Sequence, residues 1–222
     1  MNFTEALIHN LNHQSNTEYA LQMKAYLRHQ FEFFGIKTPL RRAILNHTVK
    51  LYKKDIEENI RTTVLELLQQ PQRELHHCGI ELFEKHLRKS YQKNDIEIIE
   101  TLITTNSWWD TVDFIAKQIL GTYLIQYPEA TQTVIEKYSV STNMWVNRSS
   151  ILFQLGYKHK TDEAILFNQC LRFKESDLFF IQKAIGWSLR EYGKTYSESV
   201  LNFVNSTSLK PLSQKEALRN II

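Results

Sequence analysis

Two segments, "WVNR" at residues 145–148 and "WSLR" at residues 187–190, point to the architecture of this 222-residue chain. Both place an arginine three positions after a tryptophan, and they begin 42 residues apart. Helical repeats of the HEAT and armadillo classes have a period of roughly 40–47 residues, so this spacing favours stacked helix pairs. A match of two residues can also arise by chance, and the surrounding sequence has to decide between these interpretations.

Helical periodicity dominates on both sides of these segments. Apolar residues recur at intervals of three and four, and short connections separate about twelve expected helices, with no convincing strand among them. The expected helices include residues 17–36, ended by Gly35, and residues 108–127. The 6 glycines and 4 prolines are too few for the tight turns of an all-β fold. We therefore predict an all-α fold, a single domain over residues 1–222, built as a solenoid of HEAT-like antiparallel helix pairs with a concave face.

The composition is that of a globular protein, with 42% hydrophobic and 23% charged residues. The first residues have neither a basic region nor an apolar core typical of a secretion signal, and no apolar run reaches membrane-spanning length. We expect a cytoplasmic protein that does not bind a membrane. Cys78 and Cys170 stand alone in helical segments, which favours buried free thiols over a disulfide or a metal site.

The charge pattern gives a weak indication of a polyanionic partner. The formal net charge is +3, which many unrelated proteins share. The basic residues gather in two separate segments, and this favours several spaced phosphate contacts over one basic tail. These segments contain Lys37, Arg41 and Arg42, and then Arg148, Lys158, His159 and Lys160.

The segment "NSWWDTVD", residues 106–113, is the candidate for chemistry. Trp109 and Asp113 stand four apart, so on a helix they share one face, whereas Trp108 points elsewhere and is expected to pack in the core. A carboxylate beside an indole is useful where the pair lines a groove and receives a cation. The alternative is an ordinary amphipathic helix in which Asp113 pairs with a lysine or caps a neighbouring helix, and on these residues alone that alternative is favoured.

The sequence contains no motif of several other catalytic classes. It contains no zinc-deaminase motif, no glycine-rich phosphate loop and no apparent Ser/His/Asp set. The 8 histidines are scattered, and surface or hydrogen-bonded roles are more common for such residues than metal ligation. We predict neither a metal site nor a cofactor.

Three segments resemble the characteristic helices of the AlkD family of DNA alkylation repair glycosylases. They are "TNSWWDTVDFIAKQILG", "NMWVNRSSILFQLGYK" and "FFIQKAIGWSLREYGKT", in this order and spacing. The segments "AYLRHQFEFFGIKTPLRR" and "KPLSQKEALRNI" are similar to that family near its two ends, so the resemblance covers nearly the whole chain. It implies a right-handed superhelical solenoid whose concave face binds duplex DNA. It also implies hydrolysis of the N-glycosidic bond of purines alkylated at N3 or N7, with the base left in the stack.

The resemblance also assigns roles to individual residues. Trp109, Asp113 and Trp187 match the catalytic cleft of the family. One departure is Gly156, where relatives carry lysine. The residues that match DNA-contacting positions are Tyr26, Thr38, Arg42, Arg148, Lys158 and Arg190.

The sequence is compatible with three functions. The first is a monomeric glycosylase that acts on duplex DNA containing alkylated purines. The second is a helical-repeat module that binds nucleic acid without chemistry, and the third is a protein scaffold. The set Trp109, Asp113 and Trp187 favours the glycosylase, because a carboxylate facing a polyanion weakens binding and a pure binder has no use for it.

Overall fold

The computed structural model describes residues 1–219, and these form helices without a strand. The single β-bridge recorded for the described residues joins Glu32 to Gln72. The chain divides into two compact units, Met1–Ser90 and Tyr91–Ile222. The all-α prediction is therefore confirmed, while the single domain over residues 1–222 stays a prediction. Asn220 and Ile221, at the end of the last segment of family resemblance, lie outside the described residues.

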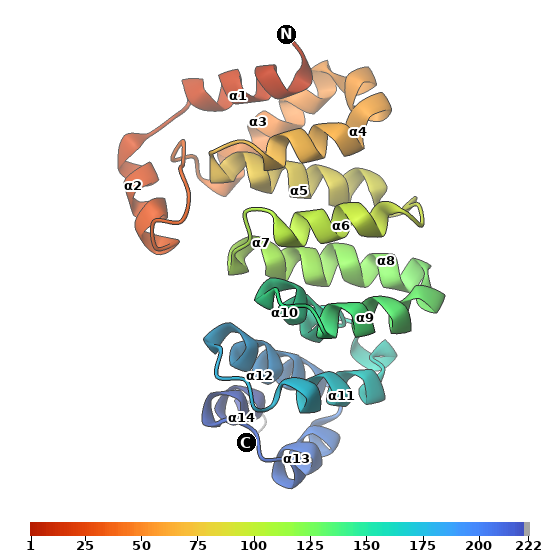
Figure 1. Cartoon of the computed structure of the whole chain (residues 1–222). Helices are drawn as coiled ribbons and strands as arrows, with labels where there is room; N and C mark the ends of the chain where they lie inside the picture. The colour runs from red at the N-terminus through yellow and green to blue at the C-terminus, as the bar shows by residue number, and fades with distance from the viewer. Residues whose placement is uncertain (220–222) are drawn as a thin grey trace. The chain divides into compact units, whose positions relative to one another are not determined.

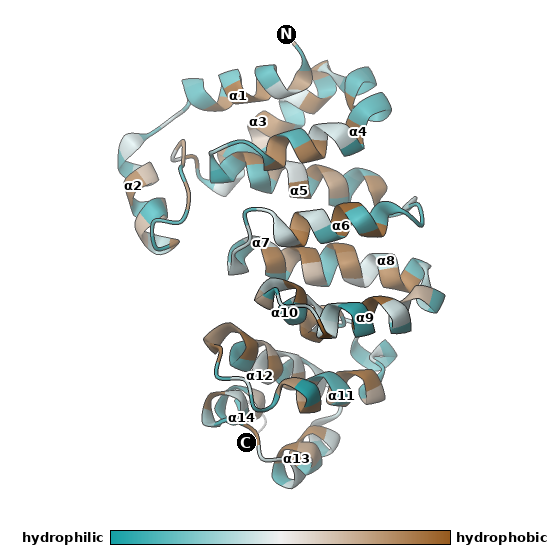
Figure 2. Ribbon diagram, in the orientation of Figure 1, coloured by the Kyte–Doolittle hydropathy of each residue, from teal (hydrophilic) through white to brown (hydrophobic). Residues whose placement is uncertain are grey.

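The first unit contains five helices in the described chain, and their hydrophobic faces form its core. Figure 2 shows hydrophobic and hydrophilic residues alternating along these helices, as amphipathic helices require. Helix α4 packs on α5, and α1 packs on α3 and α4. The bounds are α1 Phe3–His13, α2 Thr17–Tyr26, α3 Thr38–Leu51, α4 Lys53–Leu68 and α5 Arg73–Leu87.

The predicted helix over residues 17–36 is wrong in its second half. Helix α2 ends at Tyr26, and Arg28 and His29 both have left-handed backbones, with φ of 55° and 58°. The chain then crosses to α3 as an irregular segment (Figure 1). Gly35 has φ of +85°, and a Cβ there would lie 2.0 Å from the Asn16 carbonyl oxygen, so this position requires glycine.

Glu74 on α5 explains why the last part of this segment, residues 34–36, is not helical. Its buried carboxylate accepts hydrogen bonds from the backbone N–H groups of Phe34, Gly35 and Ile36, at 3.1, 2.9 and 3.1 Å. A helix would satisfy these N–H groups internally. Here a carboxylate some 40 positions along the chain replaces the helical carbonyls and fixes residues 34–36.

The second unit is a succession of packed helices. Figure 1 shows α6 running in one direction and the α7–η1–α8 segment returning beside it. Helix α10 packs against α7, α9, α11 and α12, and α12 packs against α11, α13 and α14. The bounds are α6 Asp95–Thr104, α7 Trp109–Phe114, η1 Ile115–Leu120, α8 Gly121–Gln126, η2 Pro128–Ala130, α9 Thr131–Ser139, α10 Met144–Leu152, η3 Lys158–Lys160, α11 Glu163–Phe173, α12 Phe179–Gly193, α13 Ser197–Ser206 and α14 Pro211–Leu218.

The predicted helix over residues 108–127 is continuous in direction but changes type. Its middle, η1, is a π-helix, and the residues at its two junctions keep right-handed helical angles. The Tyr157 hydroxyl donates to the Gly121 carbonyl at 2.6 Å, just after the wide turn. Because a π-helix has wider turns than an α-helix, the side chains that follow it point in different directions from those of an uninterrupted α-helix. The face of α7 that carries Trp109 and Asp113 is therefore not continued along α8.

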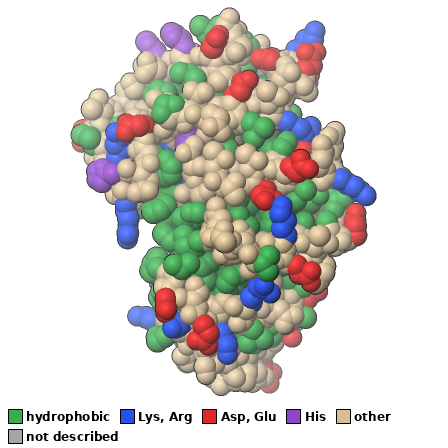
Figure 3. All heavy atoms as spheres, in the orientation of Figure 1, with side chains coloured by type: hydrophobic (Ala, Val, Ile, Leu, Met, Phe, Trp, Pro, Cys, Tyr) green, Lys and Arg blue, Asp and Glu red, His purple; other side chains and the backbone are tan. Residues whose placement is uncertain are grey.

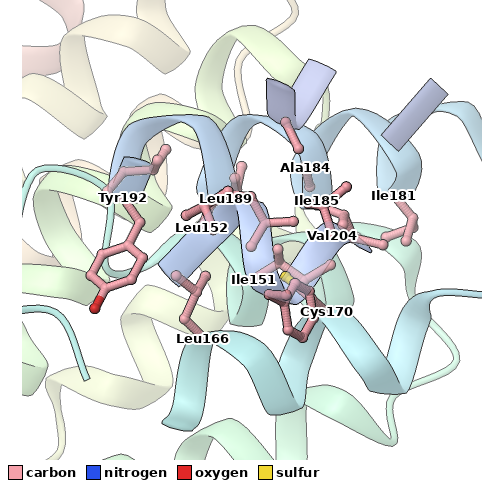
Figure 4. Packing of buried hydrophobic residues seen from close by; sticks show 14 of the residues in the cluster. Ile151, Leu152, Leu166, Cys170, Ile181, Ala184, Ile185, Leu189, Tyr192 and Val204 are labelled. Carbon is pink, nitrogen blue, oxygen red and sulfur yellow. The ribbon is translucent and has the colours of Figure 1, made fainter. Parts of the chain in front are cut away.

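Helix α12 lies in the hydrophobic core of the second unit. Ile181, Ala184, Ile185 and Leu189 of α12 meet buried residues of α10, α11 and α13, and Figure 4 shows this packing.

Both cysteines are buried and free, as predicted. Burial raises the pKa of the Cys78 thiol to about 11 and that of Cys170 to about 12. Within the described residues, none of the helices has the length and apolar character needed to cross a membrane.

Candidate active site

A pocket of about 300 Å³ in the second unit contains all three predicted catalytic residues. Helices α7, α10, α12 and α14 contribute its walls. Phe179 at its edge exposes 57% of its surface, so the pocket opens to solvent. The lining residues are Trp109, Asp113, Arg148, Phe179, Phe180, Lys183, Trp187, Arg190 and Glu216.

An aromatic cluster of Trp108, Trp145 and Phe180, which adjoins the pocket through Phe180, fixes the start of α7. The Trp108 ring centroid lies 5.6 Å from that of Trp145 and 5.5 Å from that of Phe180, and the last two rings are 5.0 Å apart. Trp108 has extended backbone angles and immediately precedes α7. The sequence predicts Trp108 in the core, but it is only half-buried; it packs in this cluster and does not line the pocket that contains Trp109. Its packing ties α7 to α10 and α12, and this brings Trp109 and Asp113 to the same pocket as Trp187. Figure 3 shows hydrophobic side chains gathered over α7 and the beginning of α12.

Asp113 forms a bidentate ion pair with Arg148 of α10. Arg148 Nε donates to Asp113 Oδ1 at 2.7 Å, and Nη2 donates to Oδ2 at 2.9 Å. The remaining terminal nitrogen, Nη1, donates to the Phe180 carbonyl oxygen at the start of α12. Arg148 is 4% exposed and the Asp113 side chain 18% exposed. The planar guanidinium therefore fixes the orientation of the carboxylate, while part of the Asp113 side chain remains accessible.

The partner of Asp113 differs from the one that the sequence suggested. The carboxylate beside Trp109 has a partner within the protein, and that partner is an arginine 35 positions away in place of the lysine that was considered. Arg148 itself uses Nε, Nη1 and Nη2 on protein acceptors. Its contact with the DNA backbone stays a prediction.

A second charged cluster lines the same pocket. It contains Arg190, whose predicted DNA contact stays a prediction, together with Lys183 and Glu216, which were missed at the level of sequence. Glu216 of α14 accepts from Lys183 Nζ at 2.8 Å and from Arg190 Nη1 at 2.6 Å. Both hydrogen bonds lower the pKa of the Glu216 carboxyl, and the one from Lys183 has the larger effect. The spacing of Lys183, Trp187 and Arg190, four and three residues, is the signal that could have placed both cations on the face of Trp187.

Arg42 and Lys158, two predicted DNA-contacting residues, are exposed on helical segments. Arg42 on α3 reaches Glu81 of α5, with its Nη2 atom 2.9 Å from Oε1, and the buried Arg41 donates to the same oxygen at 2.7 Å. Burial raises the pKa of Glu81, but the two arginines outweigh it, so the net pKa is lowered. Lys158 begins η3 with a left-handed φ of 56°.

Two further predicted contacts, Tyr26 and Thr38, belong to the first unit. Tyr26 is 70% exposed at the end of α2, and Thr38 is exposed as the first residue of α3. Their roles stay predictions. Within residues 1–219, no group of three or more His, Cys, Asp or Glu side chains is arranged to hold a metal ion.

Comparisons with known proteins point in one direction. Residues 7–221 match the family model described as DNA alkylation repair enzyme. A solved structure described as a predicted DNA alkylation repair enzyme from Enterococcus faecalis is similar, with 29% identity, a TM-score of 0.85, and coverage of 92% of this chain and 95% of that one. The crystal structure of AlkD2 from Streptococcus mutans shares the fold at 14% identity, with a TM-score of 0.61 over 91% and 95% of the two chains. No curated protein sequence matches the chain.

Proposed function

The chain belongs to the family of DNA alkylation repair enzymes, and from this premise we propose that it is a DNA glycosylase. Its substrates are positively charged purines alkylated at N3 or N7, such as 3-methyladenine and 7-methylguanine, in duplex DNA. The reaction is hydrolysis of the N-glycosidic bond. The observation that carries this proposal is a carboxylate, Asp113, held by a bidentate ion pair in an open pocket that the indoles of Trp109 and Trp187 also line.

The chemistry of these lesions suits such a pocket. An N3- or N7-alkylated purine is already cationic, so it leaves as a neutral base while positive charge moves onto the sugar. The protein does not need to protonate the base. It needs to stabilise charge on the deoxyribose, and a carboxylate about 4 Å away contributes about 4 kcal/mol at an effective dielectric of 20. Two indole faces add roughly 0.5–2 kcal/mol each.

Arg148 sets both the strength and the geometry of this effect. Its positive charge offsets part of the attraction between Asp113 and the sugar. In return, the bidentate pair keeps both carboxylate oxygens in one orientation, so no reorganisation is needed as the charge develops. The net acceleration is therefore modest, and this suffices for a labile lesion and not for a normal purine.

We also propose that the base stays in the stack. Because the pocket is open, with Phe179 exposed at its edge, it suits a deoxyribose approached from outside better than a flipped base that must be enclosed. Selection then rests on the charge and lability of the lesion, and the expected products are free 3-methyladenine and 7-methylguanine. Neutral hypoxanthine and 1,N6-ethenoadenine are not released.

The partner in this proposal is duplex DNA bound by a monomer in the cytoplasm. We propose backbone contacts from Tyr26, Thr38, Arg42, Arg148, Lys158 and Arg190. The reaction needs no metal ion and no cofactor, because the lesion supplies its own leaving-group activation.

The test is excision of 7-methylguanine from a defined duplex at saturating protein, with detection of free base. Asp113→Asn should lower the rate by at least about 100-fold, or about 2.7 kcal/mol, while binding to undamaged duplex holds or tightens. Asp110→Asn is the matched control, since Asp110 lies on the same helix and does not line the pocket.

Arg148 loses its partner in Asp113→Asn, so the folded fraction of each variant has to be measured by thermal unfolding. An excision rate equal to wild type in the folded Asp113→Asn protein contradicts the role of the carboxylate. A wild-type protein that binds duplex but releases no base is instead a non-catalytic nucleic-acid-binding module, and one that does neither is a scaffold.

A further inference from the structure

The cluster formed by Lys183, Glu216 and Arg190 has a geometry that the proposed chemistry does not use. Lys183, Trp187 and Arg190 follow one another on the same face of α12. Glu216 reaches this face from α14, and its side chain is 12% exposed. Its two carboxylate oxygens are divided between the cations, with Oε1 accepting from Lys183 and Oε2 from Arg190. One carboxylate therefore bridges Lys183 and Arg190, the two cations that precede and follow Trp187 along α12.

The packing of α14 against α12 holds Glu216 in this place. A Cβ added at Gly186 would lie 2.4 Å from Glu216 Cβ and 2.8 Å from the Ser213 carbonyl oxygen, so only glycine allows this approach. The buried Ser213 hydroxyl donates to the Gln182 carbonyl at 3.1 Å. Arg190 Nη1 also lies 3.3 Å from the Glu216 carbonyl oxygen. The carboxylate thus sits on a close, fixed helix contact.

A carboxylate at this position opposes the binding of DNA. The pocket is lined by three cations, Arg148, Lys183 and Arg190, and by two carboxylates, Asp113 and Glu216. Asp113 has a chemical role in the proposed reaction, whereas Glu216 has none there. Replacing it with a neutral residue would leave two further cations for phosphates, and each additional phosphate contact strengthens binding. Its presence needs an explanation other than affinity.

We propose that Glu216 is a positioning residue that fixes Lys183 and Arg190 on both sides of Trp187, at the expense of affinity for DNA. Lysine and arginine side chains have many rotamers, and unrestrained they can follow phosphates in several registers of the duplex. With Glu216 they present their charges at one separation. The strand can then dock in a single register, with the lesion sugar opposite Trp187 and Asp113. The catalytic part of this inference rests on the proposed glycosylase function.

The test compares wild type with Glu216→Gln, which keeps the size of the side chain and removes its charge. Affinity for an undamaged duplex is measured by fluorescence anisotropy over a series of salt concentrations. It should rise about 3- to 10-fold, and the slope of log affinity against log salt should steepen by up to about one unit. The excision rate of 7-methylguanine at saturating protein should fall about tenfold, because misaligned registers become populated.

Two further variants separate positioning from a structural role. Glu191→Gln is the matched control: it lies on the same helix, pairs with Lys194 and does not line the pocket, so neither measurement should change. In a Lys183→Met background, Glu216→Gln should change both measurements less than in wild type, since one of its two partners is gone. Equal effects in the two backgrounds contradict action through Lys183.

The outcomes also distinguish this inference from the proposed function. If wild type releases no base but Glu216→Gln still tightens and steepens binding to undamaged duplex, the glycosylase proposal fails and the restraint of the two cations stands. If wild type is active and Glu216→Gln leaves affinity and rate unchanged, the positioning role is overturned. Weaker binding together with a lowered melting temperature also overturns it, since this marks Glu216 as a packing residue.

Discussion

Glu74→Gln tests how a single buried carboxylate determines the conformation of residues 34–36. The substitution keeps the side chain's size and changes only one oxygen into an NH₂ group. In wild type, Oε1 accepts from Gly35 and Ile36, and Oε2 accepts from Phe34. Glutamine can keep the first two bonds through its single oxygen. Its amide group then faces the Phe34 N–H, donor against donor.

The magnitude follows from these three contacts. A buried N–H left without an acceptor costs about 1–3 kcal/mol, and hydrogen bonds to a charged group exceed neutral ones by about 1 kcal/mol. Because Glu74 is 3% exposed, water cannot replace the lost acceptor. We expect Glu74→Gln to lower the free energy of unfolding by about 2–4 kcal/mol, which for a protein of this length corresponds to a fall in melting temperature of about 4–15 °C.

The assay is urea unfolding followed by circular dichroism, combined with hydrogen exchange at the amides of residues 34–36. Exchange there should accelerate most, because these N–H groups lose their acceptor. Glu58→Gln is the control, since its side chain is 61% exposed and pairs with Lys54 on the same helix, and it should stay within about 0.5 kcal/mol of wild type. A Glu74→Gln protein as stable as this control would refute the reasoning.

The remaining predictions concern α12 and α14. Gly186→Ala forces α14 away from α12, because the new Cβ would lie 2.4 Å from Glu216 Cβ and 2.8 Å from a backbone oxygen. Overpacking of about 2–3 kcal/mol outweighs a helix-propensity gain of about 1 kcal/mol, so urea unfolding should show a net loss of about 1–2 kcal/mol, and an unchanged midpoint contradicts the close contact. Folding lowers the pKa of Glu216, so its ionised carboxylate contributes stability that is fully present above the unfolded pKa of 4.5 and is lost as the pH falls through the folded pKa. The stability of Glu216→Gln should therefore fall less at acid pH than that of wild type, and equal pH profiles of unfolding contradict this. Trp187→Phe keeps a smaller aromatic face and should lower 7-methylguanine excision about 3- to 30-fold with little change in duplex affinity, whereas a loss of binding alone assigns Trp187 to DNA contact.

Local sequence patterns were sufficient for the all-α fold class and for part of the site. The all-α prediction depended on the spacing of apolar residues, which is a property of each segment by itself. The grouping of Trp109 with Asp113 depended on a separation of four residues within one helix. Bringing Trp187 into the same pocket required the resemblance to the AlkD family, because nothing local relates α12 to α7.

The tertiary structure decided everything that depends on a partner far along the chain. Residues 34–36 are not helical because Glu74, about 40 positions along the chain, accepts hydrogen bonds from their N–H groups. Asp113 is an ion-paired carboxylate because α10 brings Arg148 against it. Glu216 enters the site because α14 packs closely on Gly186.

The physical reason for this division is the range of the interactions involved. Backbone hydrogen bonds within a helix, and contacts between side chains three or four positions apart, are encoded in a few consecutive residues. A buried carboxylate instead takes whichever donors the packed helices bring to it, and many pairings are compatible with one sequence. The chain alone therefore determined which residues could share a helix face, and only the packing of the helices determined which charge each of them meets.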